Sequence, residues 1–125
     1  MAATAFTTQV AGHAGLNPAV QSAALGGFTH TAPCGAGIGL MLVNGAASTV
    51  NVDVRVRSDA TVDGLPAATP AGAAAPARRI TLPATVGAIT VIPLPAAVYA
   101  DPVTGLATID IAAGTVSGAV VAISQ

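Results

Sequence analysis

The stretch Ser48-Thr49-Val50-Asn51-Val52-Asp53-Val54-Arg55-Val56-Arg57 decides the fold of this 125-residue chain. Its valines alternate with polar and charged residues, and successive side chains of a β-strand point to opposite faces. The pattern therefore predicts an antiparallel strand with a buried face of valines and a solvated face. The residues predicted on the solvated face are Asn51, Asp53, Arg55 and Arg57.

Apolar segments flank this strand on both sides. Upstream, residues 36–43 form an apolar run that ends at Asn44-Gly45, a dipeptide typical of a tight hairpin, so we expect this run to pair with the strand above. The glycine-rich residues 35–39 match no nucleotide-binding fingerprint and are expected to allow close strand packing or a bulge. Downstream, the segments predicted as strands are 78–82, 88–94, 106–111 and 116–123.

Short strands at this spacing are typical of a sandwich or a barrel. We therefore expect an all-β protein, a single small antiparallel β-sandwich or barrel that spans residues 36–125 and follows an extended N-terminal arm, residues 1–35. The arm holds one candidate short helix at residues 17–25, where Asn17 suits the N-cap and Pro18 suits the first helical position.

The composition limits the core and the partners. Hydrophobic residues make up 53% of the chain and aromatic residues 2%, so the core must be built from Val, Ile, Leu and Ala. Non-specific nucleic-acid binding rests on many phosphate contacts and on base stacking, and the chain has few basic or aromatic residues for either. The apolar runs fall far short of the roughly 20 residues of a membrane helix. We therefore expect neither nucleic acid nor a membrane as a partner.

Charged residues make up 7% of the chain, and residues 1–52 contain none. A free surface normally carries charges that keep monomers soluble, so we interpret this segment as one that a partner covers. The alternative is a small domain coated with Thr and Ser. The candidate contact residues are Phe6, Phe28, Arg78, Arg79 and Tyr99. The two arginines either solubilise an edge strand or pair with acidic residues of a neighbouring subunit.

Signals for chemistry are weak. His13, His30 and Cys34 are three potential zinc ligands, but structural zinc takes four ligands at tight paired spacings. Asp59 and Asp63 have part of the spacing of a calcium loop without its bidentate acid, and we interpret them as turn residues. We therefore expect no catalytic residue, no metal and no cofactor, and we expect that the protein is not an enzyme.

From Gly37 onward, the sequence contains a series of short elements shared with one group of proteins. The most distinctive elements are Thr61-Val62-Asp63-Gly64-Leu65 and the Pro-x-x-Val-Tyr pattern within residues 92–99. The others are residues 43–46, 49–54, 79–84, 106–111 and 116–123. In these elements the chain resembles small proteins encoded among the structural genes of tailed phages, particularly phages of actinobacteria, which are described as head decoration or minor capsid proteins.

The resemblance implies a β-rich domain on the exterior of an icosahedral virion capsid, made in the host cytoplasm. Its implied partners are the major capsid protein, whose subunit contacts it stabilises, and further copies of itself, commonly as a homotrimer. We expect the uncharged N-terminal region to anchor the protein, so that deletion of residues 1–30 abolishes head binding and leaves a folded domain. Two alternatives are a tail or head–tail joining component and a glycan-binding β-sandwich that uses Tyr99.

Overall fold

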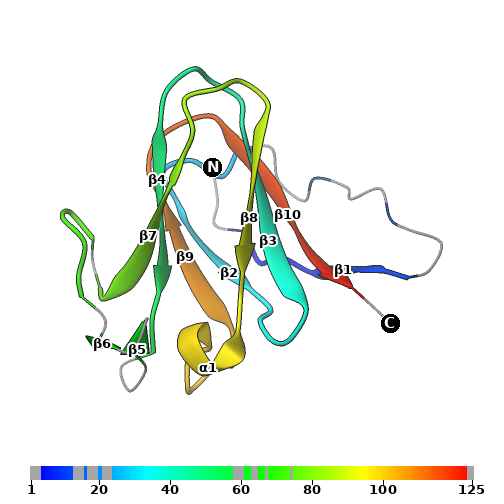
Figure 1. Ribbon diagram of the computed structural model, residues 1–125, viewed down its shortest axis with the longest axis vertical. Coiled ribbons are helices and arrows are strands. Elements are labelled where there is room, and N and C mark those ends of the chain that lie inside the picture. Colours follow the sequence, from blue (N-terminus) through cyan, green and yellow to red (C-terminus); the bar gives the residue numbers. More distant parts are fainter. Residues whose placement is uncertain are drawn as a thin grey trace.

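The computed structural model describes residues 4–12, 16, 20, 24–57, 61–62, 65–66, 68–73 and 75–123. Two four-stranded sheets pack face to face around an aliphatic core (Figure 1). The first sheet has the order β1 (Thr8–Ala11), β10 (Val116–Ile123), β3 (Ile38–Asn44), β8 (Ala88–Pro93). The second sheet has the order β2 (Thr29–Ala32), β9 (Ala107–Ile111), β4 (Val50–Arg55), β7 (Ala77–Leu82). The predicted all-β class is confirmed, as a sandwich.

Consecutive strands of the sandwich alternate between the two sheets. The one connection that stays within a sheet runs from β4 to β7, and it contains the short pair β5 (Thr61–Val62) and β6 (Leu65–Pro66). This distribution of eight strands is the arrangement of a jelly roll. β1 departs from the antiparallel rule, because it pairs parallel to β10 with Thr8 opposite Val120. The other strand pairs of the two sheets are antiparallel within the described residues.

The alternation in β4 is confirmed. Val50, Val52 and Val54 are buried in the core between the sheets, together with Val56 just beyond the strand. On the opposite face Asn51 is exposed, but Asp53 is 7% exposed, so the prediction of a solvated face is wrong at Asp53, which Arg79 contacts. The period-two pattern thus correctly predicts that the valine face of β4 is turned toward the core.

The hairpin predicted at Asn44-Gly45 is wrong. β3 pairs with β10 and β8, and β4 pairs with β9 and β7, so residues 45–49 cross from one sheet to the other. Asn44 is fully buried, and its Nδ2 donates to the carbonyl oxygens of Ser48 and Pro83, each at 2.7 Å. It thereby ties this crossing to the crossing at residues 83–87, which lies at the same end of the sandwich (Figure 1).

Several segments within residues 1–35 belong to the sandwich. β1 lies in the first sheet and β2 in the second. Phe6 is 4% exposed and packs against the buried ring of His30, with the ring centroids 6.1 Å apart. Leu25 is also part of the core. The boundary expected at residue 35 therefore does not separate an arm from the sandwich in this part of the chain.

The helix in the described residues is α1 (Ala96–Tyr99), which follows Pro95 between β8 and β9. The candidate helix at residues 17–25 lies mostly outside the described residues. In the described part of the chain, no helix has the length and hydropathy required to span a bilayer.

Deletion of residues 1–30 is expected to unfold the domain, which corrects the expectation of a folded truncation. The deletion removes β1, the start of β2 and the buried side chains of Phe6, Leu25 and His30. Loss of one large buried side chain typically costs about 2–5 kcal/mol, so losing several exceeds the stability of most small domains. Far-ultraviolet circular dichroism and thermal melting check this. A cooperative melt like that of the full chain would contradict it, and deletion of residues 1–3 is the control.

Candidate functional site

The two sheets differ in charge. The strands of the first sheet contain no Asp, Glu, Lys or Arg. The charged residues of the second sheet are Asp53, Arg55, Arg78, Arg79 and Asp110. The first sheet collects its strands from three uncharged parts of the sequence, because β3 lies within residues 1–52, β8 within 80–100 and β10 within 111–125.

The outer face of the first sheet is mostly apolar over β10, β3 and β8, whereas β1 places Gln9 beside Val121. The cross-strand rows on these three strands are Val121-Gly39-Pro93, Ala119-Met41-Val91 and Ser117-Val43-Ile89. We call these residues the uncharged face. Ile89 and Val91 on the edge strand β8 are 59% and 60% exposed. The most exposed part of this face therefore lies along β8.

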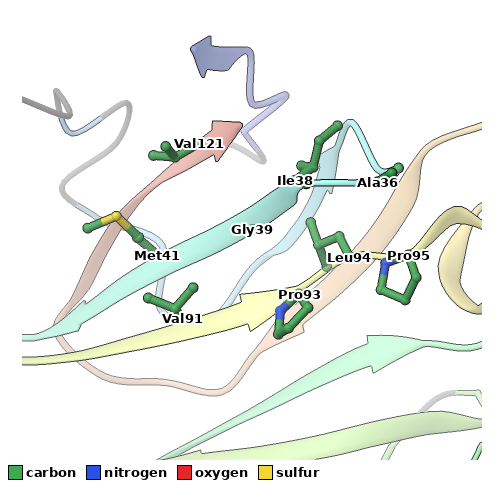
Figure 2. A pocket seen from close by; sticks show the side chains of 11 residues that line it. Ala36, Ile38, Gly39, Met41, Val91, Pro93, Leu94, Pro95 and Val121 are labelled. Atoms are coloured by element: carbon green, nitrogen blue, oxygen red, sulfur yellow. The ribbon is translucent and has the colours of Figure 1, made fainter. Parts of the chain in front are cut away.

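A groove of about 530 Å³ lies in the uncharged face, and its lining consists of apolar side chains and glycines (Figure 2). Gly39 lies between Val121 and Pro93 in the strand register. A Cβ atom at this position would approach Cγ1 of Val91 to 3.3 Å. The missing side chain of Gly39 therefore provides space in the groove, which is a role for the glycine-rich segment that the sequence analysis did not assign.

A second hollow, of about 340 Å³, lies on the other side of β8, where β8 faces β7 across the open side of the sandwich. Its lining includes Arg78 and Ile80 of β7 and Tyr99 of α1. The two hollows share three lining residues, Val91, Pro93 and Pro95. β8 is thus bordered by a hollow on each side.

The outer face of the second sheet carries charges that are paired within the chain. Arg79 forms two hydrogen bonds to the carboxylate of Asp53, from Nε at 2.8 Å and Nη2 at 2.9 Å. Arg55 binds Asp110 in the same way, at 2.7 Å and 3.0 Å. Asp53 and Asp110 lie opposite each other in the register, so each guanidinium offsets a repulsion between two carboxylates.

The stability of the protein is expected to fall in acid because Asp110 becomes protonated. Burial opposes ionisation of this carboxyl, but hydrogen bonds from Arg55 and Thr29 outweigh burial and hold the pKa of Asp110 below its ordinary value. A lowered folded-state pKa contributes stability above the unfolded-state pKa, about 3.9, and this contribution is lost as the pH falls through the folded-state pKa. Urea unfolding of the wild type and of Asp110→Asn between pH 2 and pH 6 checks this. The difference in midpoint should shrink below about pH 4, and a difference that is constant over this range would contradict the assignment.

The candidate contact residues lie in different environments. Phe6 and Tyr99 are 4% and 7% exposed and form part of the core, and Phe28 is half-buried before β2. Arg79 finds its acidic partner within the chain, in Asp53. Arg78 is exposed on β7 beside the second hollow, which also brings it near Tyr99.

The residues considered as metal ligands are engaged otherwise where the structure describes them. Nδ1 of His30 accepts the N–H of Thr4 at 2.9 Å, and its Nε2 bonds the carbonyl oxygen of Leu25 at 2.8 Å. Burial raises the pKa of the Cys34 thiol, which disfavours the thiolate. His13, Asp59 and Asp63 lie outside the described residues. Within the described part of the chain, no three His, Cys, Asp or Glu residues come together as a potential metal site.

Sequence reasoning missed the residues that make the uncharged face distinctive, above all Gly39, Ile89 and Val91. A signal was present, since residues 80–100 and 111–125 also lack charged residues, but only the topology shows that these segments join β3 in one sheet.

No family model, curated protein or solved structure matched this chain in the comparisons.

Proposed function

We propose that this chain is a structural virion protein that binds the outer surface of an icosahedral phage head and stabilises contacts between major capsid subunits. The observation that supports attachment through a surface is the uncharged face, where Ile89 and Val91 are exposed beside an apolar groove. The paired charges of the second sheet suit a face that remains in water. The assignment to a phage head rests on the sequence resemblance.

Such a protein acts by binding, without turnover. Burial of apolar surface contributes about 25 cal/mol per Å², and the lost translational and rotational freedom subtracts from each binding event. A modest footprint on each copy therefore gives a modest affinity, but many copies on one shell add up to a large resistance to separation of its subunits. In this proposal the protein sits on threefold sites as a homotrimer.

The structure disfavours the glycan-binding alternative in the form that uses Tyr99. Stacking on a sugar requires an exposed aromatic face, and Tyr99 is 7% exposed within the core. The jelly-roll arrangement itself does not choose between these roles, because it occurs in both viral capsid and lectin domains.

The proposed function is tested by sedimentation of purified protein with heads that lack it, over a series of protein concentrations. We expect saturable binding at a stoichiometry that matches threefold sites and a higher melting temperature of the heads. Absence of binding to intact heads would overturn the proposal. A discrete ring in native mass measurement would then point to the tail or head–tail joining component.

A further inference from the structure

Among the strands that the structure describes, none pairs with the outer edge of β8. β8 is the last strand in the order of the first sheet, so β3 is its partner on one side. The N–H of Leu94 donates to the carbonyl oxygen of Ile38 at 3.0 Å, in register with the β3–β8 pairs. Because backbone groups alternate in direction along an antiparallel strand, the groups of Thr90 and Ile92 also face β3, and those of Ile89 and Val91 face away from it.

Over residues 89–91, this edge has no proline, charge or other device that usually blocks strand pairing. Natural edge strands are short, bulged, covered or charged. β8 has six residues and no charged side chain, and Ile89 and Val91 are exposed on it. Pro93 lacks a backbone N–H donor, but it lies at the C-terminal end of β8. The backbone of residues 89–91 is therefore suited to accept another strand.

The surroundings of β8 match the needs of an added strand. Alternate side chains of such a strand point to opposite sides of the sheet, and recognition by strand addition uses pockets that accept them. The groove above Gly39 lies on the outer side, and the hollow lined by Ile80 and Tyr99 lies on the inner side. Both reach β8 at Val91 and Pro93.

We infer that β8 is a strand-addition site, and that its occupant is an extended segment of the shell protein, uncharged where it enters the outer groove, which pairs with the backbone of residues 89–91 and fills the hollows on both sides. This inference rests on the proposed function, because that function supplies the shell. A charged side chain in the outer groove would meet only apolar and glycine residues, and burying it without a partner is costly. The segment is therefore uncharged where it enters the groove.

A second copy of the chain fits this site less well. If β8 of two copies paired, Ile92 of the second copy would still face its own core, where it is 4% exposed, and would not enter the inner hollow. The edge is also about 20 Å long and about 10 Å deep, a footprint well below the roughly 800 Å² per partner of a stable pair of domains. An extended segment can place alternate side chains in both hollows, because neither row of its side chains is buried in a core of its own. It also does not need the larger contact area of a stable pair of domains.

The test compares Val91→Pro with Val91→Ala in binding to heads that lack the protein. Both variants remove the branched valine side chain, but only proline removes the N–H that faces away from β3, so the β3–β8 pairing should be retained. We expect Val91→Pro to bind heads at least about tenfold more weakly than Val91→Ala, through the lost hydrogen bond and the obstructing ring. Equal binding of the two variants would overturn this inference and leave the proposed function standing. Absence of binding by the wild type would overturn both.

A second measurement needs no heads and no proline variant. A capped hexapeptide of alternating valine and threonine is titrated into the ¹⁵N-labelled wild-type chain. We expect saturable shifts of the amide signals of Ile89 and Val91, together with signals from the lining of the two hollows. Absence of saturable shifts at these amides would overturn the strand-addition site. A concentration-dependent dimer of the wild type that shows the same shifts without peptide would overturn the choice of occupant.

Discussion

Replacement of Asn44 by alanine is expected to lower the free energy of unfolding by about 2–4 kcal/mol. The Asn44 side chain is fully buried, donates to the carbonyl oxygens of Ser48 and Pro83, and accepts the N–H of Ala46 at 3.1 Å. Alanine removes these three hydrogen bonds, each of which contributes about 0.5–1.5 kcal/mol net, and it leaves a cavity at a fully buried position. Such a loss is a large fraction of the roughly 5–15 kcal/mol that stabilises a typical domain.

Two further variants make this test specific. Asn44→Asp keeps the shape and the acceptor for Ala46 but places a carboxylate against two carbonyl oxygens, so it should destabilise at least as much as alanine. Asn51→Ala is the matched control, because Asn51 is exposed and its side chain accepts one hydrogen bond, from Thr81. Urea unfolding midpoints at pH 7 give the comparison. Equal midpoints for Asn44→Ala and Asn51→Ala would show that Asn44 does not hold the two crossings together.

Replacement of Val91 by arginine is expected to weaken head binding at least about a hundredfold, which corresponds to about 2.8 kcal/mol. Val91 is exposed, so the free protein should fold normally. In the complex, the guanidinium would be buried against a groove lined by apolar side chains and glycines, and burying a charge without a partner costs several kcal/mol.

Val103→Arg is the matched control for this prediction. Val103 is 93% exposed and lies in the turn after α1, outside both sheets. It adds the same charge to the protein without placing it on the uncharged face. Binding isotherms of both variants, measured by co-sedimentation with heads, give the ratio. Equal loss of binding in both variants would show that the effect comes from the added net charge and not from its position on the uncharged face.

The strands were the part of the fold that the sequence predicted best. In β4, alternation of valine with polar residues sets one face against the other, and this pattern needs no knowledge of the partner strands. The bounds predicted for β10 also agree with the structure. Such patterns are local, and they report on which side of a strand the core lies.

Strand pairing was beyond local reasoning. Asn44-Gly45 favours a turn, but the dipeptide does not specify whether the next strand returns to the same sheet or crosses to the other. The side chain of Asn44 forms one of its hydrogen bonds with Pro83, far along the sequence. This contact exists only once both crossings are in place, so no window around Asn44 contains it.

The aromatic candidates show a second limit. Exposed aromatic residues are common at interfaces, but this chain has few large side chains with which to fill its core. Phe6 and Tyr99 are accordingly buried, although both occur in segments without other strong core signals. The uncharged N-terminal region likewise contributes Leu25 and β3 to the sandwich, so part of its lack of charge reflects burial within the chain.

The central claim, that the uncharged face attaches the protein to the head, is tested most directly by the rate at which Met41 is oxidised by peroxide. Met41 lies in the middle row of that face, and Thr81→Met places a reporter on the exposed outer face of the second sheet. Peptide mapping measures both rates in the same protein, free and bound to heads. We predict that binding slows oxidation of Met41 and leaves the rate at the reporter unchanged; slower oxidation at the reporter, with Met41 unaffected, would contradict the account.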